Sequence, residues 1–244
     1  MSSIQRTSLL RLGAEFLLIF FSVVLAFIAD DWRTKQNETR AAEASLELVL
    51  RDLRQDLVGL RRLEEVHQTW NEAALELVSV VEGDATRDEL SQAADVALRW
   101  GVFRPSLVGY QGLQQTGRLR WVRDLGLHDA LVFHYDETLA YLERLKVRED
   151  GAAFRANELA ERHFRSVPAD PPKVNRLVAI SSAAEMREDR EFLGALSNLV
   201  ARRRWLNYRV SGGGPDDIYG YTGNFIVFTE QLVAAIEDYL SGES

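Results

Sequence analysis

The stretch RLGAEFLLIFFSVVLAFIADDWRTKQ, residues 11–36, decides how this chain is organised. Its apolar run from Leu12 to Ala29 is interrupted by a single charged residue, Glu15. The run lies near the lower limit of the about 17 to 25 residues that an α-helix needs to cross a bilayer. The sequence therefore predicts a transmembrane helix over 10–31, preceded by a short tail.

A cleaved signal peptide and a buried core helix are the two competing interpretations of this run. A signal peptide needs small residues before its cleavage point, but the stretch AFIADDW has Phe27 there, and an acidic residue such as Glu15 is unusual at the start of its apolar core. A core helix that is apolar on every side needs covering all round. We therefore favour an uncleaved anchor, with Trp32 as the aromatic residue at the membrane interface.

Basic residues flank the run on both sides, so the positive-inside rule gives only a small preference for one orientation. Arg6 and Arg11 precede the run, whereas Arg33, Lys35 and Arg40 follow it. We expect the amino terminus in the cytoplasm and the large carboxy-terminal domain on the other side of the membrane.

A stripe with heptad spacing continues from the anchor into the polar sequence behind it. In the anchor it holds Glu15, Leu18, Ser22, Leu25, Ala29 and Trp32, and beyond a polar gap it reaches Leu46, Leu50, Leu53, Leu57 and Leu60. The small residues Ser22, Ala26 and Ala29 would let membrane helices approach closely. For Glu15 itself we favour a pair with Arg11, one helical turn earlier, at the membrane surface. The alternative is that the stripe is a helix–helix contact in a homo-oligomer, with Glu15 facing its neighbours or a polar cavity.

The rest of the chain is predicted to be all-α, because its apolar residues follow helical spacing and it contains only 5 prolines in 244 residues. We expect a tail over 1–9, the anchor, a long stem helix over 32–82, a helical bundle over 84–210, a flexible joint over 211–216, and a last helix and tail over 217–244. Within the bundle, TRDE is a capping box that opens the second helix. Further helices are expected over about 127–148, 151–166 and 187–209, and no strand is predicted.

The bundle also contains a distinctive turn segment. Its spaced residues are Phe103, Pro105, Tyr110, Leu113, Gly117, Leu119 and Val122. Pro105 is placed to start a short helix, and Gly117 is placed to end it in a left-handed cap. A ligand groove along this segment is the alternative that we consider less favoured, because Gly117 already has a structural task.

The anchor and this segment together resemble a family of bacterial single-span membrane proteins. Members combine a short anchor that ends in Trp with a segment of the form F-x-P-x(4)-Y-x-x-L-x(3)-G-x-L. The chain departs from that pattern where Ala14 separates Gly13 from Glu15 and where SGGGPDDIYGYTGN resembles an insertion. The resemblance implies an anchor and a helical fold, and it implies no activity. Together with the orientation expected from the flanking charges, we expect an anchor in the inner membrane and a periplasmic carboxy-terminal domain.

Composition excludes several classes of function. The chain has 29 Lys and Arg residues against 37 Asp and Glu residues, so it lacks the basic face of a general nucleic-acid binder. It contains no cysteine, which excludes disulfides and thiolate catalysis. Neither a serine-hydrolase elbow nor a phosphate-binding glycine loop is present. We therefore predict no cofactor and no enzymatic activity.

One pair of residues has the spacing of a carboxylate-bridged metal site in a helical bundle. Glu64 and His67 form the Glu-x-x-His pair, but such sites need a second copy, which the sequence lacks. His128 and His134 are six residues apart and lie on different faces of a helix. We therefore predict no metal site.

The run ARRRW is the concentrated basic patch of the chain. Successive residues of a helix point in different directions, so we expect Arg202, Arg203 and Arg204 to form separate ion pairs with acids such as Asp189 and Glu191. The alternative is an anionic partner such as lipid headgroups.

Together, these features predict a membrane-anchored helical scaffold or adaptor of the bacterial envelope. It would self-associate through its anchor and stem and present its helical domain to a protein partner. The alternative is a membrane-tethered sensor whose bundle binds a small ligand or a stress signal. The expected partners are membrane lipid and further copies of the chain.

Overall fold

The computed structural model of this protein describes residues 3–101, 104–168, 175–211 and 225–242. In the first helix it describes the side chains from Phe16 onwards. Most of the described chain is helical, which confirms the predicted helical bundle.

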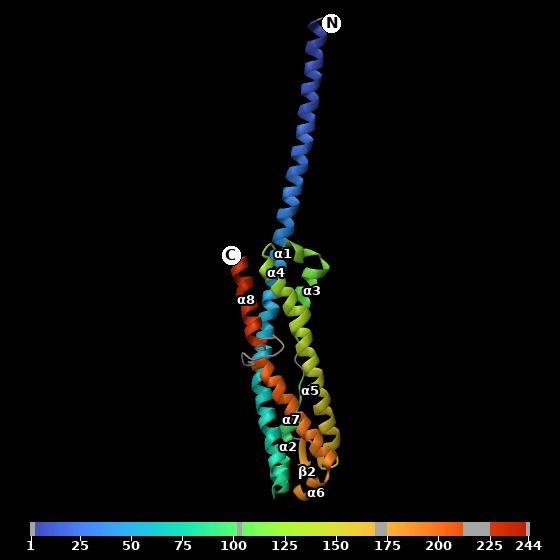
Figure 1. Cartoon of the computed structure of the whole chain (residues 1–244), viewed down its shortest axis with the longest axis vertical. Helices are drawn as coiled ribbons and strands as arrows, with labels where there is room; N and C mark the ends of the chain where they lie inside the picture. Colours follow the sequence, from blue (N-terminus) through green and yellow to red (C-terminus); the bar gives the residue numbers. More distant parts are fainter. Residues whose placement is uncertain (1–2, 102–103, 169–174, 212–224, 243–244) are drawn as a thin grey trace.

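The first helix, α1 (Ser3–Glu82), is 80 residues long. At a rise of 1.5 Å per residue this is about 120 Å, and its amino-terminal part projects away from all other elements (Figure 1). The first buried side chains along it are Thr39 and Ala42, and from there α1 forms the spine of the bundle. Within the described residues, no helix is both long enough and apolar enough to cross a membrane. The transmembrane helix expected over 10–31 therefore has no support from the structure.

The remaining elements pack against α1 and one another. In chain order they are α2 (Arg87–Ala97), α3 (Val108–Gln115), the 3-10 helix η1 (Arg118–Trp121), α4 (Leu125–Val132), the π-helical turn η2 (Phe133–Thr138), α5 (Leu139–Ala160), β1 (Phe164–Val167), β2 (Arg176–Ala179), α6 (Ala183–Glu188), α7 (Arg190–Ser211) and α8 (Phe225–Ser241). Helix α2 starts at the predicted capping box, where Thr86 N donates to the Glu89 carboxylate across 2.8 Å.

The two helices predicted on either side of Gly151 form one column. Helix α4, the turn η2 and α5 follow one another without a break, so residues 125–160 run alongside the bundle part of α1 (Figure 1). Helices α7 and α8 pack against α1, and α7 also packs against α5. Gly151 does not end the helix, because a helical glycine lowers stability by only about 1 kcal/mol, which packing on both sides of it can outweigh.

The prediction that the chain has no strand is wrong in one place. Strands β1 and β2 form an antiparallel pair in which Phe164 lies opposite Ala179. Helix α2 supports β2 through side chains, because Ala179 N donates to Ser91 Oγ across 2.9 Å and Leu177 N donates to the Asp95 carboxylate. The hairpin therefore depends on a contact between segments far apart in the sequence.

The described core residues fall into three clusters along α1. One joins α1, α2, α5, α7 and the hairpin, and a second joins α1 to α3, α4, η2 and α8. Between them, Leu60 and Leu63 of α1 meet side chains of α5, α7 and α8. The cavity described next opens at this junction.

Candidate functional site

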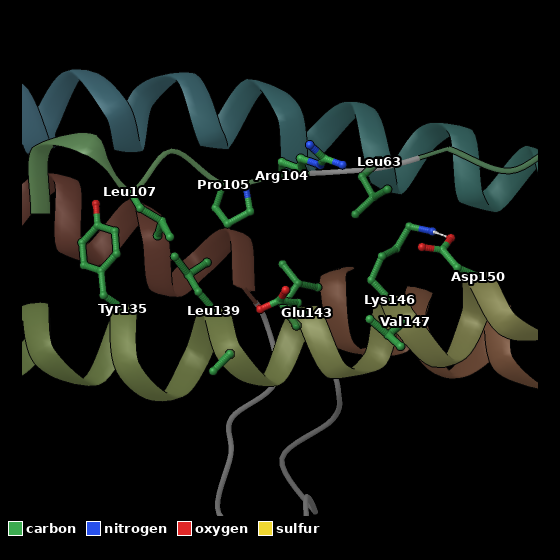
Figure 2. Close-up of a pocket in the computed structure, with 12 residues that line it drawn as sticks. Leu63, Arg104, Pro105, Leu107, Tyr135, Leu139, Glu143, Lys146, Val147 and Asp150 are labelled. Carbon is green, nitrogen blue, oxygen red and sulfur yellow. Dashed lines mark hydrogen bonds and ion pairs between the residues drawn. The ribbon is translucent and has the colours of Figure 1, made fainter. Parts of the chain in front are cut away.

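A cavity of about 580 Å³ lies between α1, α5 and the segment 104–107 (Figure 2). Its apolar wall includes Leu63, Leu107, Leu139 and Leu142. Cavities of 300 to 1,000 Å³ with mostly apolar walls and a few polar groups are typical of small-molecule sites. The less favoured alternative of a ligand groove along the turn segment meets this cavity at Leu107. The walls on α1 and α5 were not predicted, because they come from separate parts of the chain.

Two carboxylates of α1 hold the segment that forms one wall of the cavity. Ser106 N donates to both Asp56 oxygens, at 3.0 and 3.1 Å, and Gly109 N donates to Asp52 Oδ2 across 2.8 Å. Gly109 lies so close to α1 that an added Cβ would stand 2.7 Å from Val49 N. The start of α3 is therefore fixed to α1 through backbone groups.

Burial and nearby carboxylate charges change the pKa values of Asp56 and of a neighbouring tyrosine. Burial raises the pKa of Asp56 to about 6, and the Asp52 charge adds to the rise. The hydrogen bond from Ser106 N lowers this pKa, but by less than burial raises it. Burial, together with the charges of Asp56 and Asp52, also raises the pKa of Tyr135. Tyr135 lines the cavity, and its hydroxyl has no hydrogen-bond partner among the described residues. It is a protonated donor at any physiological pH.

Four charged residues line the cavity. They are Arg104, Glu143, Lys146 and Asp150. The Lys146 ammonium is buried and donates to the carboxylates of Asp150 and Glu149, the latter across 2.5 Å. Burial raises the pKa of Asp150, while the bond from Lys146 opposes the rise. Lys146 and Asp150 therefore largely neutralise each other.

Behind Lys146 the network continues into the core of the bundle. Arg203 is fully buried, and its Nε donates to Glu149 Oε1 across 3.2 Å. Its guanidinium also donates to the backbone carbonyls of Trp70, Ala97 and Arg99, so it closes the end of α2. Burial lowers the pKa of Arg203, but the Glu149 carboxylate favours its charged form.

The expected separate ion pair is present for the central residue of the basic run, but its partner differs from the acids that were expected. Arg203 is buried and pairs with Glu149, and it is closed to any anionic partner from outside. The acids that were expected to pair with this run, Asp189 and Glu191, instead lie 3.2 and 3.1 Å from Arg162. Arg202 and Arg204 are exposed.

The turn segment has the predicted cap but a later helix start. Gly117 has a φ of 66°, which confirms the left-handed cap. Helix α3 begins at Val108, so Pro105 lies before it and instead lines the cavity. Tyr110 and Leu113 are buried and Leu119 packs beside them, whereas Phe103 lies outside the described residues.

The stem leucines pack inside the chain itself. Leu46, Leu50, Leu53 and Leu60 are buried by other elements of the bundle, and Leu57 is half-buried beside them. The stripe is therefore not open to a second copy along this stretch, which corrects that part of the expectation.

The anchor residues lie on the projecting part of α1. Ser22, Ala26, Ala29 and Trp32 are exposed, and Ser22 Oγ donates to the Leu18 carbonyl across 2.7 Å. The side chains of Arg11 and Glu15 lie outside the described part, as do the residues 212–216 of the expected joint.

Two of the histidines that the sequence singles out, His67 and His134, are buried. His67 is buried against the Trp70 ring, and burial lowers its pKa to about 3, helped by the charges of Lys146 and Arg203. Burial lowers the pKa of His134 to about 4. Among the residues with described side chains, no three metal-ligating groups come close enough to hold an ion.

Comparisons with models of known protein families, with curated proteins and with solved structures found no match to this chain.

Proposed function

We propose that this chain is a non-enzymatic scaffold or adaptor of the bacterial envelope, attached to a membrane by the amino-terminal part of α1. The observation that carries the proposal is a series of exposed large apolar side chains on the amino-terminal part of α1, which no other described element covers. Phe16, Leu18 and Phe27 are 69%, 70% and 71% exposed. Exposed apolar surface of this extent marks contact with a lipid or another protein.

A lipid environment suits the polar group within this series. Ser22 is the one polar residue between Phe16 and Ala29, and its hydroxyl is bonded inside the helix. A hydroxyl that is satisfied within its own helix loses little on leaving water. Directly after the series, Lys35 and Asp31 form an ion pair of 2.7 Å, which suits a headgroup layer.

The proposed attachment is a helix that crosses the membrane once. In this proposal the run Leu12–Ala29, about 27 Å long as a helix against the about 30 Å of the hydrocarbon core, would span the bilayer with little tilt. The location in the inner membrane, the periplasmic bundle and the kinship with single-span bacterial proteins are parts of the same proposal. So is self-association through the small residues Ser22, Ala26 and Ala29.

Vesicle flotation tests the attachment. We expect the full chain to float with vesicles of phosphatidylethanolamine and phosphatidylglycerol, and the double variant Leu18→Glu, Leu25→Glu to stay at the bottom of the gradient. The matched control, Leu48→Glu with Val58→Glu, changes two exposed residues of the same helix within the bundle and should float. Equal flotation of both double variants would exclude attachment through this segment.

Crosslinking tests the self-association separately. The chain has no cysteine, so single cysteines introduced at Ser22 and Ala29 report only their own contacts. We expect disulfide-linked dimers at these two positions and far fewer for Val23→Cys, which points elsewhere on the helix. Equal yields at all three positions would contradict a specific contact.

A second candidate function is favoured by the cavity: a membrane-tethered sensor that binds a small ligand in its bundle. The cavity abuts the Lys146 network, and segment 104–109, which forms part of its wall, is tied to α1 at Asp52 and Asp56. A ligand would therefore contact both α5 and the segment tied to α1. Ligand binding would appear as a rise in melting temperature, because it stabilises only the folded state.

A further inference from the structure

The cavity has charges of both signs that are not used elsewhere in the described fold. Arg104 lies on the segment beside α1, and Glu143 lies on α5 across from it (Figure 2). Among the described residues, neither has an ion-pair partner within 4.0 Å, whereas Lys146 and Asp150 pair with each other. Both Arg104 and Glu143 are exposed, so they stand where the cavity meets solvent.

The interior of the cavity is largely apolar. Leu107 and Leu139 line it between the charged groups and Tyr135, as Figure 2 shows. Tyr135 lies at one end of the lining, and its hydroxyl is closed to solvent, so a ligand would meet the ring and not the hydroxyl.

From this arrangement we infer that the cavity binds an apolar zwitterion: a free apolar amino acid or a short apolar peptide. The ligand carboxylate pairs with Arg104, its ammonium group pairs with Glu143, and its side chains lie against Leu107 and Leu139. This inference rests on the second candidate function, a bundle that binds a small ligand.

Ligands that carry only a negative or only a positive charge fit the lining less well. The lining holds two cations, Arg104 and Lys146, and two carboxylates, Glu143 and Asp150. An anion without an ammonium group would leave Glu143 opposed to it, and a cation without a carboxylate would face Arg104. Uncompensated charge in a partly desolvated site is costly, so a ligand with both charges gains most.

Calorimetric titration of the full-length protein with the dipeptide Leu-Leu tests the inference. We expect saturable binding, and at least tenfold weaker binding of N-acetyl-Leu-Leu and of Leu-Leu amide, which each lack one charge. Gly-Gly should show no binding, because it lacks the apolar side chains. Ala140→Phe, at a half-buried position of the lining, should abolish Leu-Leu binding by filling the space.

Two charge variants identify which group meets which end of the ligand. Arg104→Gln should weaken Leu-Leu at least tenfold and leave Leu-Leu amide unchanged, because the amide has no carboxylate to lose. Glu143→Gln should weaken Leu-Leu equally and leave N-acetyl-Leu-Leu unchanged. Arg148→Gln, an exposed position of α5 outside the lining, is the matched control and should bind like the parent.

The results distinguish a wrong ligand class from a bundle that binds no small ligand at all. Absence of Leu-Leu binding to the parent, or equal affinity of the parent and both charge variants, overturns the inference. Titration with the uncharged probe cyclohexanol then decides the rest: binding that Ala140→Phe removes keeps a ligand-binding bundle and rejects the zwitterion. No binding of either probe rejects both.

Discussion

The Arg203 guanidinium and the Glu149 carboxylate face each other across 3.2 Å, and both side chains are fully buried. The pair joins α7 to α5, and Glu149 also accepts from Lys146 at the edge of the cavity. Removing one partner of a buried ion pair leaves a charge without compensation in the core. The stability of the bundle therefore depends on both members being present.

Glu149→Gln tests this dependence. We expect the free energy of unfolding to fall by about 3 to 5 kcal/mol, because the substitution leaves Arg203 charged and buried. Denaturant unfolding followed by circular dichroism measures the change. Glu158→Gln is the matched control on the same helix: its pair with Arg155 is exposed, so the loss should stay below about 1 kcal/mol. Equal losses for the two variants would contradict the role of burial.

Local signals in the sequence predicted much of the fold. The capping box at Thr86 and the left-handed turn at Gly117 depend on a few neighbouring residues, and both are present. The leucines from Leu46 to Leu60 have the spacing of a buried helix face, and they are packed against the bundle. The spacing does not indicate which surface covers this helix face, so the stripe was expected to contact a second copy of the chain.

Arg203 shows why the site was harder to predict. Three adjacent arginines suggest a surface patch, yet Arg203 continues an apolar stripe of α7 with helical spacing. The buried members of that stripe are Phe192, Leu196, Leu199, Arg203, Leu206 and Val210. This spacing was available in the sequence as a signal of burial. The acceptors for the arginine, however, come from α1, α2 and α5, and no local pattern indicates them.

Asp56 should make the protein less stable as the pH rises. Its pKa is about 6 in the folded protein against 3.8 without burial, so its contribution to stability is complete below pH 3.8 and is lost as the pH rises through about 6. Asp56→Asn keeps an oxygen for Ser106 but cannot ionise. We expect the unfolding free energy of the parent relative to this variant to fall by about 2 kcal/mol between pH 4 and 7. If the difference in unfolding free energy between the parent and Asp56→Asn stayed constant with pH, Asp56 would not titrate in this range.

His134 should act in the opposite direction. Burial lowers its pKa from 6.5 to about 4, so its contribution is complete above pH 6.5 and is lost as the pH falls towards 4. His134→Leu removes the imidazole that takes up a proton on unfolding. Between pH 6.5 and 4, the unfolding free energy of the parent should therefore fall by about 3 kcal/mol more than that of the variant. His128→Leu, at a half-exposed position, is the control and should keep the acid dependence of the parent, because His134 is intact. Acid sensitivity that survives in His134→Leu would contradict this assignment.

Gly109→Ala should separate α3 from α1. The added methyl group would stand 2.7 Å from Val49 N and 2.9 Å from Val49 Cα, and these are backbone atoms that cannot rotate away. We expect the free energy of unfolding to fall by about 1 to 3 kcal/mol, the usual cost of overpacking. The bond from Gly109 N to Asp52 should lengthen at the same time, which would speed hydrogen exchange of that amide.

Gly112→Ala is the matched control in the same helix, because nothing lies within 4 Å of its added methyl group. Alanine is favoured over glycine within a helix by about 1 kcal/mol, so Gly112→Ala should be as stable as the parent or more so. If both variants were stabilised alike, α3 would not be held against α1 in the way that the structure shows.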